Sequence, residues 1–264
     1  MTYGFIGTGN MGGALARALV RTVSPSNVYL NNRTPAKAEA LAAELGARAD
    51  TAAHIAAACD YIFLGVKPNL IAGVLAQLAP MLAQRTDKPV LVSMAAGVTI
   101  AALEQAAPGC PILRIMPNTA CAVGAGLTLY DANALLTKPQ LDAFLADMAA
   151  GRLEALPEHL IDAGSAVAGC GGAFACLFME GLADGAVTCG LPRDKANTFA
   201  AQMLLGAARL ALESGKPFGQ MKDEICSPGG TTIAGVRALE EGGLRAAAMN
   251  AVIAAYEKTL QLKK

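Results

Sequence analysis

Three glycines near the start of the chain have the spacing that binds the pyrophosphate of a dinucleotide. Gly7, Gly9 and Gly12 lie in the stretch GFIGTGNMGGALA, directly after an apolar, strand-like run and directly before a helical one. In such a G-x-G-x-x-G pattern the first glycine allows a tight turn, the second lets the backbone approach the phosphates, and the third lets the helix pack on the strand. The helix start then faces the pyrophosphate. In this context the pattern predicts a dinucleotide site, and its alternative is a packing turn without a ligand.

The end of the second predicted strand indicates which dinucleotide binds. Sites that prefer NAD usually place an Asp or Glu about 20 residues after the glycine pattern, where it bonds the ribose hydroxyl. Here the stretch reads LNNRTPAK, and the first acid is Glu39. Arg33 could stack on adenine and pair with a 2′-phosphate, with Lys37 one turn further on. We therefore expect NADPH as the cofactor, with use of NADH left open. The alternative is a solvated helix start.

Two further strand ends carry residues suited to the cofactor. In VKPN (66–69) Lys67 could contact a phosphate or the backbone, although the Lys-Pro pair could equally be a rigid turn. In SMAAGV (93–98) the small residues would let a nicotinamide ring lie close to the backbone. The cofactor-binding residues predicted from these strand ends and from the glycine turn are Ile6, Gly7, Thr8, Gly9, Asn10, Met11, Gly12, Asn32, Arg33, Val66, Lys67, Pro68, Ala95, Ala96 and Gly97.

A second glycine turn lies far from the first, in CSPGGTTIAG (226–235). Unhindered glycine amides followed by two threonines at a helix start could hold a small anion. An ordinary capped helix is the alternative, since Ser and Thr after Pro-Gly are common caps. RIMPNTA (114–120) adds an amide and a hydroxyl at the end of an apolar strand. The candidate substrate-binding residues are Asn118, Ser227, Gly229, Gly230, Thr231 and Thr232.

Alternating strands and helices position the first set of residues. Apolar runs at 3–7, 27–31, 61–66, 89–94, 111–116, 126–130 and 152–156 read as strands, with helical runs such as 11–22, 35–45, 51–58, 69–83 and one near 138–149 between them. This alternation predicts an α/β fold: a Rossmann-type, doubly wound, mainly parallel sheet over residues 1–156. The last two strands could extend the same sheet.

Residues 157–264 form an all-helical second domain in this prediction, with helices near 161–189, 193–214, 218–226, 231–240 and 243–262. Several of these helices are apolar on nearly all sides, and such a helix must be buried on most faces. About 105 residues cannot enclose them alone. We therefore expect a subunit interface in this domain.

Composition excludes several function classes. Lys plus Arg and Asp plus Glu number 21 each, which gives no electrostatic reason to expect nucleic acid or a membrane surface as a partner. Seven scattered cysteines and two histidines, with no C-x-x-C pair, argue against a metal site and suggest reduced, mostly buried thiols. We see no signal peptide and no apolar run of about 20 residues, so we expect a soluble, cytoplasmic protein.

Taken together, these motifs resemble one family. GFIGTGNM, VKPN, AAGVTI, RIMPNT, GLPR and SPGGTTIAGVRALE occur in the order and spacing of the pyrroline-5-carboxylate reductases, over essentially the whole chain. The resemblance implies reduction of 1-pyrroline-5-carboxylate to L-proline with NAD(P)H, a helical dimerisation domain, and a homodimer or a larger ring of dimers. It also implies that Thr232 lies beside the imine nitrogen as a hydrogen-bond partner or proton donor. The family commonly has SGSGPAY where this chain has AGCGGAF (168–174), so those hydroxyls are not indispensable to the chemistry or this member is altered.

Two rival functions remain. A β-hydroxyacid dehydrogenase has a similar second-strand end but needs a catalytic lysine, and GCGGAFACLFMEG contains none. A non-catalytic dinucleotide sensor would keep the first glycine turn but has no use for SPGGTT. Glu180 and Asp184, four residues apart on a predicted helix, are expected to be solvated or paired with Arg193 rather than catalytic, and His159 is read as a surface or cap residue.

Overall fold

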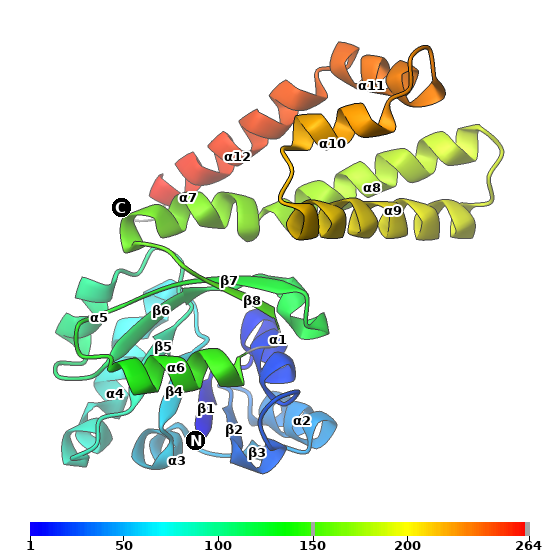
Figure 1. The fold of residues 1–264 in the computed structure, drawn as a ribbon. Coiled ribbons are helices and arrows are strands. Elements are labelled where there is room, and N and C mark those ends of the chain that lie inside the picture. The colour runs from blue at the N-terminus through cyan, green and yellow to red at the C-terminus, as the bar shows by residue number, and fades with distance from the viewer. Residues whose placement is uncertain (149–150, 262–264) are drawn as a thin grey trace. The chain divides into compact units, whose positions relative to one another are not determined.

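The computed structural model describes residues 1–148 and 151–261 and divides into two compact units (Figure 1). The first unit contains Met1–Gly169 together with the end of the last helix from Ala255 on, and the second contains Cys170–Ala254. The sequence-based boundary at 156/157 falls before helix α7 (Glu158–Ala168), whereas the structural boundary falls after it. The difference arises because α7 packs on the sheet of the first unit.

One eight-stranded sheet forms the centre of the first unit. Its spatial order is β3-β2-β1-β4-β5-β6-β7-β8, and all neighbours run parallel except β6 and β7. The strands are β1 (Tyr3–Ile6), β2 (Val28–Asn31), β3 (Arg48–Ala49), β4 (Tyr61–Leu64), β5 (Val90–Ser93), β6 (Ile112–Met116), β7 (Gly126–Ala132) and β8 (Gly151–Ala155). The doubly wound fold and its extension by the last two strands are thus confirmed. The sequence did not predict β3, because two residues are too few to show a pattern.

Helices cover both faces of this sheet. One face packs against α1 (Asn10–Leu19), α2 (Pro35–Leu45) and α6 (Lys138–Asp147). The other packs against α3 (Ala52–Ala58), α4 (Ile71–Gln84) and α5 (Ile100–Ala106). The strands alternate between the two cores: Phe5 and Phe63 stack in the first, with ring centroids 4.3 Å apart, while Ile62 and Leu64 enter the second. Burial on both faces explains why the central strands β1, β4 and β5 read as nearly unbroken apolar runs.

Helix α7 covers the β6–β7 part of the sheet. Ile161 of α7 packs with Met116 of β6 and Leu129 of β7 in a small separate core. Gly164 makes this approach close, since a Cβ there would lie 2.6 Å from the Leu129 Cδ1 atom. Arg114, a single charged residue in β6, forms ion pairs with acidic side chains of α7. These contacts make α7 part of the first unit.

The second unit is helical throughout its described residues. It contains α8 (Gly171–Thr188), α9 (Arg193–Ser214), α10 (Phe218–Ile225), α11 (Thr231–Glu241) and most of α12 (Leu244–Gln261). The predicted single helix 161–189 is two helices, because the chain breaks at Gly169 and Cys170 before a further pair of glycines. The other helices lie where the sequence predicts them. Residues 149 and 262, at the ends of two predicted helices, lie outside the described residues.

The helices of the second unit bury few side chains within this chain. Ala183, Ala196 and Ala200 form the core of the α8–α9 hairpin, and α10, α11 and α12 have no buried residue along their described lengths. Large apolar side chains are exposed instead: Leu212 is 74% exposed and Phe218 80%. This exposure agrees with the prediction that a second chain is needed to cover these helices.

One stretch is long and apolar enough, by length and composition alone, to cross a bilayer. It is Glu158–Thr188, with a mean hydropathy of 1.6, and 11% of its most apolar window is buried. The sequence analysis expected no such segment and was wrong on this criterion, since residues 163–179 carry no charge. The first part of the stretch is nevertheless bound to a β-sheet, with the Asp162 carboxylate paired to the buried Arg114.

All seven cysteines are free thiols, but the expectation that most are buried is wrong within this chain. Cys59, Cys110 and Cys121 are buried between sheet and helices, whereas Cys170, Cys176 and Cys189 on or beside α8 are exposed. Burial raises the pKa of the Cys59 thiol to about 12. The exposed thiols belong to the helices whose apolar faces are also uncovered.

Candidate active site

The first glycine turn is packed so tightly that two of its three glycines cannot carry a side chain. Gly7 has a φ of 100°, and its N–H donates to the Asn31 carbonyl at 2.9 Å. A Cβ on Gly12 would lie 2.2 Å from the Gly7 carbonyl oxygen, and a Cβ on Gly65 would approach the same oxygen as closely. The turn is therefore held between β1, β4 and the start of α1, which is the strand–turn–helix context that the sequence predicts.

Gly9 meets open space instead. Nothing lies within 4 Å of the position that its Cβ would take, and no side chain caps α1, whose first helical hydrogen bond runs from the Gly13 N–H to the Gly9 carbonyl. The N–H groups of Asn10, Met11 and Gly12 are thus left for an outside acceptor. A helix start with free amides and an unobstructed approach fits a pyrophosphate. The residues present therefore fit a dinucleotide.

A hollow of about 410 Å³ lies between α1, α2 and the end of β2. Asn32 lines this hollow with its side chain fixed, because its amide donates to the Thr8 hydroxyl at 3.1 Å while its oxygen accepts from the Thr34 N–H at 3.0 Å. Lys37 lines the hollow. Arg17, on the opposite wall, is paired with Glu44 through two 2.7 Å hydrogen bonds, so its charge is already balanced.

A second hollow, of about 430 Å³, lies on the other side of Asn31 and is lined mostly by apolar residues of α4 and the β4–α4 connection. Arg33 lines its rim, and among the described residues no ion pair or side-chain hydrogen bond involves the Arg33 guanidinium. An apolar slot beside a free guanidinium suits an adenine ring with a phosphate next to it. Arg33 and Lys37 therefore line two different hollows, and both hollows lie next to the end of β2.

The other predicted cofactor residues end β4 and β5. Lys67 is exposed at the start of the 3₁₀ turn Pro68–Leu70, and the Leu70 N–H donates to its carbonyl at 2.9 Å. The Lys67 side chain is therefore open to solvent, and its contact with a phosphate or the backbone stays a prediction. After β5, Ala95 is buried, and Gly97 has a φ of 76°, a region that favours glycine. The segment then enters α5 through the cap residue Thr99.

Asn118 is engaged at both ends of its amide. Its nitrogen donates to the carbonyl of Ala168, the last residue of α7, at 3.0 Å, and its oxygen accepts from the Leu127 N–H at 3.3 Å. The side chain therefore joins the segment after β6 to β7 and to the end of α7. This geometry gives Asn118 a positioning role within the first unit, which the sequence analysis did not foresee.

A buried ionic cluster between β6 and α7 was not predicted from the sequence. Arg114, in the middle of β6, is fully buried, and its guanidinium bonds Glu158 at 2.9 Å and Asp162 at 3.1 Å. A signal was present, because a charge inside the otherwise apolar strand PILRIM needs a partner, and Glu158 and Asp162 are spaced to share one face of a helix.

The second glycine turn lies in the second unit, between α10 and α11. Gly229 has a φ of 69°, the Gly230 N–H donates to the Ser227 carbonyl at 3.0 Å, and Gly230 precedes α11 with no side-chain cap. The amides of Thr231 and Thr232 therefore start a helix without an internal acceptor. The predicted substrate residues 227–232 thus form one turn, while Asn118 belongs to the other unit.

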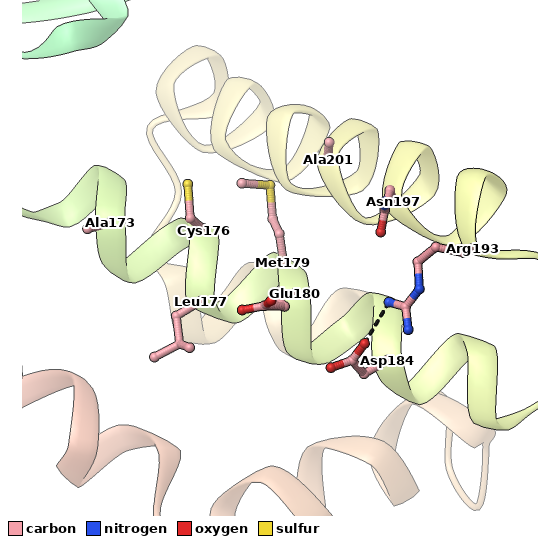
Figure 2. A pocket seen from close by; sticks show the side chains of 9 residues that line it. All are labelled: Ala173, Cys176, Leu177, Met179, Glu180, Asp184, Arg193, Asn197 and Ala201. Atoms are coloured by element: carbon pink, nitrogen blue, oxygen red, sulfur yellow. Dashed lines mark ion pairs between the residues drawn. The ribbon is translucent and has the colours of Figure 1, made fainter.

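An open hollow of about 900 Å³ lies along α8 and α9, as Figure 2 shows. Asp184 and Arg193 form an ion pair across it at 2.6 Å, which confirms the predicted pairing. Glu180 points into the same hollow one turn earlier. Within residues 1–148 and 151–261, no group of three or more His, Cys, Asp or Glu side chains lies close enough to hold a metal ion.

Two family models match the chain, one for each part. Residues 2–97 match the model described as NADP oxidoreductase, coenzyme F420-dependent, and residues 158–262 match the model described as pyrroline-5-carboxylate reductase dimerisation. The second model begins at residue 158, the first residue of α7, although α7 packs with the first unit.

Full-length proteins resemble the chain as well. The pyrroline-5-carboxylate reductase of Escherichia coli is 39% identical over 99% of this chain and 98% of its own length. The solved pyrroline-5-carboxylate reductase of Coxiella burnetii superimposes with a TM-score of 0.89 at 32% identity, covering 100% of this chain and 98% of that one. The pyrroline carboxylate reductase of Plasmodium falciparum, solved with NADP bound, gives a TM-score of 0.88 at 29% identity, over 100% and 98% of the two chains.

Proposed function

Because this chain belongs to the pyrroline-5-carboxylate reductase family, we infer that it is an oxidoreductase that reduces 1-pyrroline-5-carboxylate to L-proline with NAD(P)H. The structural observation that carries this inference is the second glycine turn, Ser227–Thr232. A protein that only bound a dinucleotide would need the turn after β1 and nothing resembling the uncapped start of α11. A reductase of a small anionic substrate needs both.

The first unit holds the cofactor in this proposal. The free amides at the start of α1 bind the pyrophosphate, the slot beside Arg33 takes the adenine, and the segment 95–97 takes the nicotinamide. When bound, the nicotinamide supplies the hydride that reduces the imine carbon. Arg33 and Lys37 bind the 2′-phosphate, since no acid lies at the end of β2 to bond a free ribose hydroxyl. NADPH is therefore the preferred cofactor.

The turn between α10 and α11 holds the substrate. The amides of Gly229, Thr231 and Thr232 bind the carboxylate at the helix start, with the Ser227 hydroxyl as a further donor, while Gly230 shapes the turn through its own bond to the Ser227 carbonyl. The Thr232 hydroxyl bonds the imine nitrogen. Because a threonine hydroxyl is a weak acid, its role is to orient the nitrogen, and the proton arrives through water or is already on the imine. Asn118 acts indirectly, since its amide is occupied by the backbone of its own unit.

The active form is a homo-oligomer. The dimerisation model covers α7 to α12, and the helices it covers expose their apolar side chains within a single chain. A second copy covers these faces, including that of α8, so the apolar stretch Glu158–Thr188 does not need lipid. The protein is accordingly proposed to be soluble and cytoplasmic, without nucleic acid or membrane as a partner.

A direct assay tests the reaction. Purified enzyme with NADPH and 1-pyrroline-5-carboxylate should consume NADPH and form proline, whereas NADP with a 3-hydroxy acid should give no reduction of the cofactor. If the folded oligomer does not reduce the imine, the proposed function is wrong. Turnover of the hydroxy acid would favour the rival dehydrogenase.

The role of Thr232 has its own test. Replacement by alanine removes one hydrogen bond to the reacting nitrogen, so kcat/KM for the imine should fall about 10- to 100-fold, as loss of a hydrogen bond worth about 1.5–3 kcal/mol implies. Binding of NADPH should not change. Thr198→Ala is the control, since its hydroxyl bonds only the Asp194 carbonyl on the surface of α9. Equal kinetics in both variants would show that Thr232 does not touch the substrate.

A further inference from the structure

A buried ionic cluster joins three elements of the first unit, namely β6, α7 and the start of α5. Arg114 of β6 is fully buried, with its Nη1 atom 2.9 Å from a Glu158 oxygen and its Nη2 atom 3.1 Å from an Asp162 oxygen. Both acids belong to α7. The guanidinium therefore attaches the first turns of this helix to the middle of β6.

The Glu158 carboxylate has a second partner that extends the cluster. The same oxygen that bonds Arg114 accepts the Ile100 N–H at 2.7 Å. Ile100 is the first residue of α5 and lies three residues after Gly97, the last residue of the segment 95–97 proposed to hold the nicotinamide. Asp131, which faces Arg114 across the β6–β7 pair, accepts the Glu158 N–H at 2.7 Å. One carboxylate thus connects the nicotinamide segment, β6 and α7.

The far end of α7 is fixed as well. The Asn118 amide donates to the carbonyl of Ala168, the last residue of the helix. Between the two ends Gly164 lets the helix lie against Leu129 and Leu156 of the β7–β8 region. The first turn of α7 is therefore held to β6 and the start of α5, its middle to β7 and Leu156, and its last residue to the segment after β6.

Stability alone is a weak reason for such a cluster. Desolvating a guanidinium and two carboxylates offsets most of their mutual attraction, and apolar side chains of similar volume often serve a fold equally well. In addition, Arg114 Nε is a buried nitrogen without a hydrogen-bond partner, the one such side-chain atom among the described residues. Hydrogen bonds between charged groups fix the direction in which each partner lies, and apolar packing does not.

We propose that Arg114 and Glu158 are positioning residues for imine reduction. The pair holds 95–99 and α7 in one arrangement, so that the nicotinamide segment is ordered before the cofactor arrives. Neither side chain touches substrate or cofactor in this proposal, which rests on the proposed function. Variants of this pair should therefore lower kcat without lowering the affinity for the cofactor to the same extent. The pyrophosphate and adenine sites, which provide that affinity, lie outside the cluster.

Two variants and one control test the proposal. Glu158→Gln keeps an acceptor for the Ile100 N–H but removes the charge, and Arg114→Met combined with Asp162→Leu replaces the buried pair by apolar volume and allows the chain to fold. Arg85→Lys is the control. Arg85 is another largely buried arginine of this unit, but it bonds the carbonyls of Ala56 and Cys59, near the opposite, amino-terminal edge of the sheet.

Three measurements separate positioning from stability. For both test variants kcat should fall roughly 10- to 100-fold, the scale of a misplacement of about 1 Å, and the isotope effect with NADPH deuterated at the transferred position should increase as that step becomes limiting. The dissociation constant for NADPH, followed through its own fluorescence because the chain has no Trp, should stay within about two-fold. Amide hydrogen exchange of residues 95–101 should accelerate in the protein without cofactor.

The outcomes are distinct. If the variants lose only thermal stability, like Arg85→Lys, or if kcat and NADPH affinity fall in proportion, the positioning role is overturned. If the wild-type enzyme fails to reduce the imine, the proposed function fails, and that result is visible before any variant is made. Unchanged exchange of 95–101 in Glu158→Gln would overturn the proposal independently of activity.

Discussion

At the scale of single residues, the glycines after β1 differ in the reason why each lacks a side chain. Gly12 is excluded by its own chain, since a Cβ would collide with the carbonyl of Gly7. Gly9 is free of the protein and is limited only by what binds there. Within one G-x-G-x-x-G pattern, the protein's own packing therefore requires a glycine at position 12 and leaves open space at position 9.

This difference predicts two distinct phenotypes. Gly12→Ala should lower both the thermal stability and the affinity for NADPH, because backbone must move to relieve a 2.2 Å contact. Gly9→Ala should leave stability unchanged and weaken NADPH binding about ten-fold or more, through contact with the pyrophosphate. Thermal denaturation and fluorescence titration measure the two quantities. Gly13→Ala is the control, since its Cβ would meet only the mobile ends of Arg17 and Leu41.

Arg33 should determine cofactor preference. Removing a guanidinium that pairs with a phosphate costs about 1.5–3 kcal/mol, so Arg33→Ala should raise KM for NADPH roughly 10- to 100-fold. KM for NADH, which lacks that phosphate, should change little. Lys138→Ala, at an exposed ion pair on α6, provides the control. An equal rise for both cofactors would show that Arg33 only stacks on the adenine.

At the scale of elements, α7 shows why a boundary drawn from composition differs from one drawn from packing. From Glu158 to Gln261 the described elements are all helices, and the family model also begins at residue 158. The helix nevertheless buries Ile161 against β6 and β7 and depends on Gly164 for its approach. The sequence therefore groups α7 with the helices that follow it, whereas its contacts make it part of the first unit.

A pair of glycine substitutions tests this packing. Gly164→Ala places a Cβ 2.6 Å from Leu129 and 3.0 Å from Leu156, so the protein should be destabilised by about 1–3 kcal/mol, the usual cost of overpacking. Gly73→Ala, in the interior of α4 with nothing within 4 Å, should stabilise by about 0.5–1 kcal/mol. Denaturant unfolding without cofactor measures both. Similar effects of the two changes would mean that α7 does not lie close to β7.

Most elements could be predicted from the sequence because their patterns are local. The central strands β1, β4 and β5 are almost entirely apolar, and the glycine turns are recognised by their spacing. The Arg114 cluster could not be assembled in this way, since its acids lie 44 and 48 residues further along the chain. The break at Gly169 was missed because the apolar pattern continues across it. Which side chains of α8 are buried depends on a second chain, which no single-chain pattern contains.

At the scale of the whole molecule, the two units differ in how much apolar surface each buries within a single chain. The first unit encloses two large cores, one on each face of its sheet. In the second, three alanines form the buried core, and leucines, methionines and phenylalanines are exposed. Cofactor binding should therefore be a property of one chain and catalysis a property of the assembly.

Charged substitutions on α9 test this division. Leu205 and Leu212 are seven residues apart, on one face of the helix, and are 59% and 74% exposed. Leu205→Glu with Leu212→Glu should dissociate the oligomer, abolish imine reduction and leave NADPH binding within about two-fold of wild type. Sedimentation, turnover and fluorescence measure these properties. Leu135→Glu, at a similarly exposed leucine of the first unit, should change none of them.

The absence of buried side chains along the described lengths of α10, α11 and α12 also has a consequence for how the protein matures in the cell. The amino-terminal half is synthesised first and can fold while still attached to the ribosome, whereas the last three helices have little to fold against until another chain arrives. The rate at which the oligomer forms then depends on the square of the concentration of newly made chains. A low rate of synthesis would lengthen the time in which these helices depend on chaperones and are open to proteases.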